Sequence, residues 1–549
     1  MLTFLAGLTE PIATVCFVAD DQGDPVLTPY EEVLAKAQGS DPFSIPNGAT
    51  PDNNADFRNL LDARFLASFR ARLGVPPAPD PSKLPDLVVL GADTAAVQFN
   101  MLCSEFSVAA VHGGLFVPLT WSAQSQDPSS PWVFTTKVDM RLSTVDGSAY
   151  SKLPADVQQR IKNLSGSAFS VQQLLFDLTN AALETVPTIS GVAPGSVAYT
   201  LLEQYFVGAY FTEMQKQALP ILGCSVSVQS APPSTLTLTD LNFNVNPYED
   251  PNGQPYPNPT PDQQQAATLN YLCAANHNQL PPAVSFNWNW LDTTQMSDHD
   301  GVMAINRNTL ANYFKINLAP MVPPNCILVN VDVSLDSASE PHYNWTLTGG
   351  QKPNISQPLT GQTVLSFSYS SGSQDDAGLD GDIGAMDIRP SYVMNVDFVG
   401  NTVVITQHIV IYVYVRHLQT SGSANMVDKQ IVDTFTIGVD AQGRLTTTKT
   451  SKLTDNSSTP SVNPVLDFFT NVNQLFDDVS NHVSGFQGSQ LTDPPVSIVQ
   501  DFVFPGGNTF TYKNAAFSDF QDLVSYITYT DPLKGKAGKV TAPVHSATH

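Results

Sequence analysis

The sequence has 549 residues, with 25 basic and 50 acidic side chains and a formal net charge of −25 at pH 7. Single hydrophobic cores stop growing at about 250–300 residues, so this length predicts more than one domain. Binding to a phosphate backbone needs clustered Lys and Arg side chains, which the acidic balance disfavours. We therefore expect no nucleic-acid partner.

Cysteine usage and the N-terminus bear on the cellular compartment. The cysteines do not form a C-x-x-C pair, which favours buried reduced thiols over disulfides or a zinc site. The N-terminus lacks a basic region and is broken by Glu10-Pro11, so we expect no signal peptide. The sequence contains no run of about 18 apolar residues, so we expect no transmembrane segment. The protein is therefore expected to be cytoplasmic, or exported without a recognisable signal peptide. The five cysteines are Cys16, Cys103, Cys224, Cys273 and Cys326.

Residues 1–85 are predicted to form an N-terminal arm. One helix is expected over Asp56–Leu73, because its apolar residues recur at intervals of three and four. The run Val75–Pro85 is rich in proline and is typical of a linker.

Residues 86–296 are predicted to form a first folded unit. It begins with an acidic residue, a short apolar strand, a cap at Asp93 or Thr94, and an apolar-striped helix that ends near Leu102. Alternating apolar and polar residues predict strands further on, and two apolar-striped segments between them predict helices. The expected strands are Trp132–Leu142 and Ser225–Val245, and the expected helices are Val171–Glu184 and Ser196–Leu219.

Residues 297–531 are predicted to form a second unit that begins in the same way. A strand over Gly301–Ile305 leads to a cap at Asn306 and a helix over Arg307–Ala319. The segment Val403–Arg416 is about 14 residues of mainly β-branched and aromatic type, whereas ordinary strands have about 5–6 residues. A strand this long indicates an extended, coiled sheet, and the helix expected over Pro464–Val483 is the best candidate for what the sheet encloses. Further strands are expected at Cys326–Leu335, Tyr343–Leu347, Thr363–Ser370, Ser391–Val399 and Ile431–Val439, with a polar tail over 532–549.

Three stretches together resemble the accessory proteins of clostridial neurotoxin gene clusters, which belong to the tubular lipid-binding (TULIP) superfamily. They are the strand and helix of Asp300–Leu318, the segment Ser170–Asn180, and the C-terminal segment Gln500–Tyr529 with its Pro-Gly-Gly turn. The resemblance implies an α+β fold with two TULIP-like units, each a long, highly curved antiparallel sheet wrapped around amphipathic helices. It also implies an apolar groove for lipid.

Residues that could carry catalysis or bind metal do not form a recognised motif. The sequence contains no G-x-S-x-G, H-E-x-x-H or Walker pattern, which favours a non-enzymatic protein without a cofactor. His408 and His417 are nine residues apart on one strand, so their side chains should point to opposite faces. His299 lies between Asp298 and Asp300, an arrangement that an acidic turn before a strand explains as well as a catalytic cluster does. The loop Asp375–Asp382 has oxygen ligands and glycine turns but lacks the EF-hand spacing, so a solvated loop is favoured over calcium, and no metal is predicted.

The apolar helix stripes are the candidate ligand-binding residues. Such stripes normally form plain core, and they line a ligand only if the sheet does not close onto the helix. Asn287–Trp290 is open to two interpretations, as an interfacial aromatic anchor or as inward-packing residues. The candidate lining residues are Tyr205, Phe206, Tyr210, Leu310, Phe314, Leu318, Phe468, Phe469, Leu475 and Phe476.

Two functions follow from these observations, and a third, an enzyme acting on an apolar substrate, would require a convergent cluster of His, Asp and Ser side chains. The first is non-enzymatic binding of a lipid or another apolar small molecule between curved sheet and helices, as a carrier or toxin-accessory protein. The second is a structural or interaction subunit of a multi-protein, toxin-like complex, with packed cores and no ligand. A protein partner from the same gene cluster is compatible with both.

Overall fold

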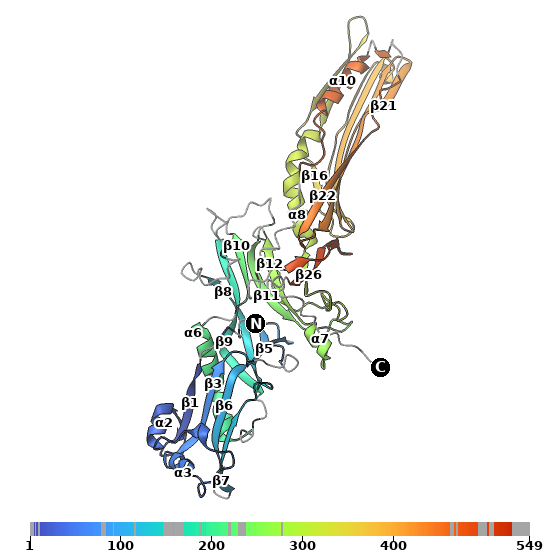
Figure 1. Cartoon of the computed structure of the whole chain (residues 1–549). Helices are drawn as coiled ribbons and strands as arrows, with labels where there is room; N and C mark the ends of the chain where they lie inside the picture. The colour runs from blue at the N-terminus through green and yellow to red at the C-terminus, as the bar shows by residue number, and fades with distance from the viewer. Residues whose placement is uncertain are drawn as a thin grey trace, which may run out of the picture.

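The computed structural model describes residues 11–77, 84–91, 93–114, 117–145, 169–185, 194–217, 221–228, 238–275, 278–461, 470–491 and 510–529, with a few isolated positions and short pieces between them. The fold is α+β and elongated, with open antiparallel sheets arranged along its length (Figure 1). Every strand pairing among these residues is antiparallel.

The first sheet joins the N-terminal segment to strands beyond residue 85. Residues 11–73, which the sequence predicts to be an arm with one helix, supply three of its five strands and two helices that pack on it. The strands, in spatial order, are β2 (Pro25–Pro29), β1 (Pro11–Ala19), β3 (Phe65–Leu73), β6 (Cys103–Gly114) and β7 (Val117–Ser125). The helices are α2 (Tyr30–Lys36), the 3-10 turn η1 (Pro42–Ser44) and α3 (Ala55–Asp62).

The predicted helix over Asp56–Leu73 is therefore wrong in its second half. The helix ends at Asp62, and Arg64 takes a left-handed conformation with φ +58°. Beyond it, Phe65, Phe69 and Leu73 are buried together with the two alanines between them, so apolar residues recur at every second position. A period of two is the pattern of a strand, which the three-and-four spacing concealed.

The second sheet corrects two more expected helices. The segment expected to be a helix over Val171–Glu184 forms part of a 17-residue strand that pairs on both sides, and residues 96–101 also form a strand. Its order is β23 (Phe502–Val503), β10 (Ile221–Val228), β9 (Phe169–Thr185), β8 (Phe134–Val145), β5 (Ala96–Met101) and β4 (Val88–Leu90). The first unit thus begins strand–strand, unlike the strand–helix beginning of the second.

The expected helix over Ser196–Leu219 is confirmed as a continuous helical segment. Ser196 caps it by accepting a hydrogen bond from the main-chain N–H of Tyr199 at 3.1 Å. It comprises α5 (Val197–Leu201), the π-helical turn η4 (Leu202–Phe206) and α6 (Val207–Gln217). A two-stranded ribbon and one helical turn follow: β11 (Leu238–Asn246), β12 (Thr268–Ala275) and α7 (Pro261–Gln265).

A seven-stranded sheet dominates the C-terminal half, and α8 and α10 lie along one side of it (Figure 1). The predicted long strand is confirmed and extended, because β19 and β20 have 16 residues each and β21 has 20. The strands are β16 (Asn354–Ser356), β17 (Thr363–Ser370), β19 (Gly384–Val399), β20 (Thr402–His417), β21 (Thr420–Val439) and β22 (Leu445–Asp455), with β18 (Ser373–Ala377) pairing β19. The helices are α8 (Arg307–Leu318) and α10 (Val472–His482).

Two smaller sheets complete this half. One joins the strand that precedes α8 to the C-terminal strands, and the other is a hairpin beside β18. The first contains β13 (Gly301–Ile305), β26 (Leu523–Tyr529), β24 (Phe510–Tyr512) and β25 (Ala516–Phe517); the second contains β14 (Leu328–Leu335) and β15 (Pro341–Thr348). Three short 3-10 turns are η5 (Ala319–Met321), η6 (Pro323–Asn325) and η7 (Leu379–Gly381).

Candidate functional site

The predicted lining residues of α8 are packed core. Leu310, Phe314 and Leu318 are each at most 1% exposed, and the ring of Phe314 lies 5.9 Å from that of Phe398 on β19. The same core contains the inward residues of β20, which alternate strictly with half-buried outward ones. On α8, the stripe therefore meets the sheet directly.

The stripe in the first unit is also largely buried. Phe206 lies 4.9 Å from Phe106 and 4.8 Å from Phe134, and the buried hydroxyl of Tyr210 donates to the carbonyl of Leu102 at 3.1 Å. Tyr205 differs, because it is 37% exposed. A cavity beside Phe206 has a volume of about 10 Å³, which is room for one water at most.

The third predicted stripe lies partly outside the described residues. Leu475 is fully buried on α10 and Phe476 is half-buried against the same core. Phe468 and Phe469 lie outside the described residues, as does the start of the helix expected at Pro464. The described stripe residues of α8 and α10 belong to one hydrophobic core.

The histidines and the acidic loop have structural partners. His408 is half-exposed on the outer face of β20, 2.8 Å from Asp428, whereas His417 is buried on the inner face, so the predicted opposite orientation is confirmed. His299 stacks on Tyr526 with ring centroids 4.5 Å apart. In the acidic loop, Asp375 accepts a hydrogen bond from the main-chain N–H of Val333 at 2.8 Å. Among the described residues, no group of three or more His, Cys, Asp or Glu side chains could hold a metal ion.

A buried arginine joins two loops that sequence reasoning did not connect. Arg307, the first residue of α8, is 5% exposed and donates to the carbonyls of Pro358, Gly361 and Thr363 at 2.7–2.9 Å. It also donates to the side-chain oxygen of Gln521 at 2.5 Å. The guanidinium fork thus fixes the loop between β16 and β17 against the turn before β26.

These two loops expose large apolar side chains. Leu359 is 80% exposed and Phe520 is 79% exposed, and each is adjacent in sequence to a residue that Arg307 binds. Ile316 on α8 and Ile355 on β16 are also exposed, and Gln357 hydrogen-bonds Lys315 and Asn312 of α8. We call Ile316, Ile355, Leu359 and Phe520 the apolar patch.

One sequence signal for this site exists. An arginine in the first turn of a helix opposes the helix dipole, which favours acidic side chains there. Arg307 occupies that position and so indicates another role for the side chain. The loop residues Leu359 and Phe520 carried no comparable signal, because single exposed apolar residues are common.

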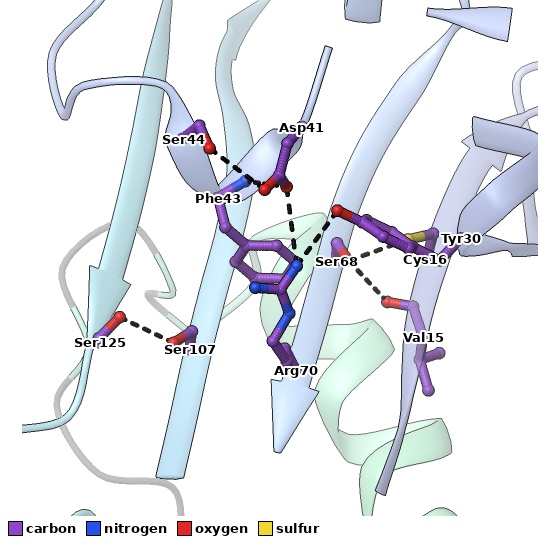
Figure 2. A network of polar contacts seen from close by, with 10 residues as sticks. All are labelled: Val15, Cys16, Tyr30, Asp41, Phe43, Ser44, Ser68, Arg70, Ser107 and Ser125. Atoms are coloured by element: carbon purple, nitrogen blue, oxygen red, sulfur yellow. Dashed lines mark hydrogen bonds and ion pairs between the residues drawn. The ribbon is translucent and has the colours of Figure 1, made fainter. Parts of the chain in front are cut away.

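A polar network lies on the first sheet beside α2 (Figure 2). Arg70 on β3 lies 4.1 Å from the ring centroid of Phe43 and donates to the hydroxyl of Tyr30 at 3.2 Å, with Asp41 at 3.7 Å. Burial, together with a hydrogen bond and the negative charge of Asp41, raises the pKa of Tyr30 to about 12. Burial likewise raises the pKa of Cys16 to about 11, which keeps the thiol protonated and unreactive near neutral pH. This network joins β3 to α2 and η1, which is a structural role.

An open hollow of about 440 Å³ lies between β15 and α10. It is lined by Trp345, Leu347, Asp478, Asn481 and His482. Trp345 donates its indole N–H to Asp478 at 3.1 Å, which fixes the ring against α10. Its lining is largely polar, so it does not provide the apolar groove that the resemblance implies.

The segment Asn287–Trp290 lies in a loop between β12 and β13. Trp288 is 46% exposed, and its ring lies 4.7 Å from that of Phe286 and 5.7 Å from that of Trp290. These rings therefore form an aromatic cluster at the surface, and Trp290 is half-buried within it.

No family model and no curated protein matches the sequence. Among solved structures, the chain is similar to P47 from Clostridium botulinum A2, with 8% sequence identity and a TM-score of 0.37 over 95% of this chain and 97% of that chain. A likeness at this level carries no conclusion about function, and membership of the TULIP superfamily stays a prediction. The described helices include none that is long and apolar enough to cross a membrane.

Proposed function

We propose that this protein is a non-enzymatic interaction protein, a rigid elongated subunit that joins a multi-protein assembly through its apolar patch. The observation that carries the proposal is the pair Leu359 and Phe520, which are about four-fifths exposed on two loops fixed by one buried arginine. Each of the two lies beside a residue that Arg307 binds, and exposed apolar surface held on ordered loops is a common feature of protein interaction sites.

Energetics favour this use of the patch. Burying one Leu or Phe side chain contributes about 1.5–3 kcal/mol. Arg307 already orders both loops through its hydrogen bonds, so a partner does not have to immobilise them on binding. The type of assembly, a toxin-accessory complex, is taken from the sequence resemblance alone.

Lipid carriage is the second candidate function. It is favoured by the 16- to 20-residue strands of the long sheet and the two helices beside it (Figure 1). An acyl chain would gain about 0.8 kcal/mol per buried CH₂. It would also have to displace residues such as Phe314 and Leu475, which are fully buried. The interaction function needs no such rearrangement, and we therefore place it first.

The apolar patch is tested by the double variant Leu359→Ser/Phe520→Ser in the source cells, with Leu379→Ser as the matched control. Leu379 is 86% exposed on η7 and lies outside the patch. We expect the parent and the control to migrate on native gels in a complex heavier than the 59.2 kDa chain, and the double variant to migrate as the free chain. Migration of all three as the free chain would contradict the proposal.

Native mass spectrometry of the purified protein, followed by organic extraction, separates the two functions. The interaction function predicts the mass of the bare chain. A stoichiometric apolar ligand in the extract would instead establish the lipid-carrier function.

A further inference from the structure

A second surface, remote in sequence from the apolar patch, combines aromatic rings with negative charge. Phe286, Trp288 and Trp290 are mutually in contact, with ring centroids 4.7–5.7 Å apart. Nearby, Tyr248 and Tyr256 stack at 6.1 Å. We call these five residues the aromatic surface. Trp288 is 46% exposed, and the other four are half-buried, so their rings are partly available to a partner.

Asparagine side chains hold this surface in place. Asn246 accepts from the main-chain N–H of Phe286 at 2.6 Å. Asn289 bonds both main-chain groups of Glu249 at 2.8 Å, accepting from its N–H and donating to its carbonyl. Asn244 donates to the carbonyl of Val284 at 2.5 Å. A loop without regular structure is thereby fixed to the end of β11, and its rings are positioned before any partner arrives.

The charge around the aromatic surface has one sign. Residues 217–306, which contain the whole surface, include seven Asp and Glu residues and no Lys or Arg. Asp250 lies in the turn whose Gly253 packs against Asn287, the neighbour of Trp288. Asp292 follows Trp290 by two residues and accepts from the hydroxyl of Tyr248 at 3.4 Å.

Both carboxylates keep their charge over a wide pH range. A hydrogen bond from the main-chain N–H of Gln254 is the main cause that lowers the pKa of Asp250. A hydrogen bond from the main-chain N–H of Thr294 does the same for the pKa of Asp292. Fixed negative charge beside aromatic faces attracts cations in two ways, by ion pairing and by the ring quadrupole.

We propose that the aromatic surface binds an arginine-bearing segment of a partner protein. A guanidinium group stacks on an aromatic face and also bonds carboxylates through its planar fork, so it fits Trp288 and the two aspartates better than an ammonium group does. Nucleic acid and anionic membranes are disfavoured, because a stretch of 90 residues without Lys or Arg repels them. This surface shares no residue with the apolar patch, so either proposal can fail without the other.

The test uses the purified full-length protein and a fluorescein-labelled peptide of alternating Arg and Ser, followed by fluorescence anisotropy in about 50 mM NaCl, where exposed charges are weakly screened. We expect the Arg peptide to bind at least about 10-fold more tightly than the same peptide with neutral citrulline. Lys in place of Arg should give intermediate affinity. Equal affinity for the Arg and citrulline peptides would overturn the proposal.

Variants separate a specific surface from the general attraction of an acidic protein. Trp288→Ala leaves the net charge of −25 unchanged, and we expect it to weaken binding of the Arg peptide about 5- to 10-fold. Asp250→Asn/Asp292→Asn keeps the side-chain oxygens that hold the two turns and should weaken binding by a similar factor. The control Leu379→Ala, at an exposed site on η7, should bind as the parent does. Parent-like binding by Trp288→Ala would overturn the proposal.

Phosphatidylcholine vesicles test the competing membrane-anchor function of the same rings. We expect no sedimentation of the parent protein with such vesicles. Sedimentation that Trp288→Ala abolishes, without binding of the Arg peptide, would overturn the proposal in favour of a lipid surface. Urea unfolding of each variant verifies that lost binding does not reflect lost folding.

Discussion

Asp522 accepts a hydrogen bond at 2.7 Å from the main-chain N–H of Arg307, a residue 215 positions earlier in the chain. The bond places a carboxylate at the N-terminus of α8, where free N–H groups and the helix dipole favour negative charge. Asn306 satisfies a second N–H of the same turn, that of Asn308, at 2.9 Å. One helix end is thus capped both by its own sequence and by the turn before β26.

Replacing Asp522 by alanine should destabilise the protein. The change removes an acceptor and a negative charge from the start of α8, at a cost of about 1–2 kcal/mol in the free energy of unfolding. Asp522→Asn keeps an acceptor and should cost less. The control is Asp519→Ala in the same turn. Urea denaturation measures these differences, and equal midpoints for Asp522→Ala and Asp519→Ala would disprove the capping role.

Replacing Arg307 should cost more. Arg307→Leu leaves the carbonyls of Pro358, Gly361 and Thr363 without their donor, which we expect to lower the free energy of unfolding by about 3 kcal/mol. Arg307→Lys restores the charge without the fork and should recover only part of this loss. Arg389→Leu removes a largely exposed arginine that pairs with Asp387 on β19, and should lie within about 1 kcal/mol of the parent.

Gly443 and Gly23 allow a matched comparison of two similar turns. In the first turn, Asp440 accepts hydrogen bonds from two main-chain N–H groups, and in the second turn Asp20 does the same. Both glycines have a positive φ, +74° at Gly443 and +93° at Gly23. An added Cβ at Gly23 meets open space, whereas one at Gly443 would overlap Thr511.

We therefore expect Gly23→Ala to cost about 1 kcal/mol for the left-handed backbone, and Gly443→Ala to cost about 2–4 kcal/mol because the overlap adds to it. The measurement is urea unfolding of both variants beside the parent. Equal destabilisation would mean that β24 moves away from the turn without loss.

Alkaline pH should destabilise the network of Tyr30. Its pKa is raised from 10 to about 12 by burial and by Asp41, so the unfolded chain loses this proton first. The stabilising contribution is complete below about pH 10 and falls as the pH rises to about 12. Tyr30→Phe should remove this part of the slope of the free energy of unfolding against pH, which urea unfolding from about pH 9 to about pH 12 measures. Ser44→Ala, at the edge of the same network, carries no such proton and should retain the parent slope.

Several elements could be predicted because their information is local. The strand Gly301–Ile305, the cap at Asn306 and the helix that follows agree with the structure, and so does the unusually long strand around Val403–Arg416. In these segments apolar periodicity, β-branched composition and capping residues all favour the same structure.

Other elements were decided by their partners. The segment Val171–Glu184 is rich in Leu, Gln and Ala, which favour helix, yet it pairs with β8 and β10 as a strand. Pairing on both sides satisfies the backbone of the whole segment, and tertiary context of this kind overrides the weak intrinsic preference for helix.

The sequence by itself determined the acidic charge, the long strands and the apolar stripes of the helices. Only the tertiary structure decided that Leu310, Phe314 and Leu318 are packed core and that Leu359 and Phe520 are exposed. The physical reason is that periodicity identifies a face to be buried but not what buries it. The loops of the apolar patch are joined to α8 by bonds from Arg307 to residues 51 to 214 positions away, and such distances leave no local pattern.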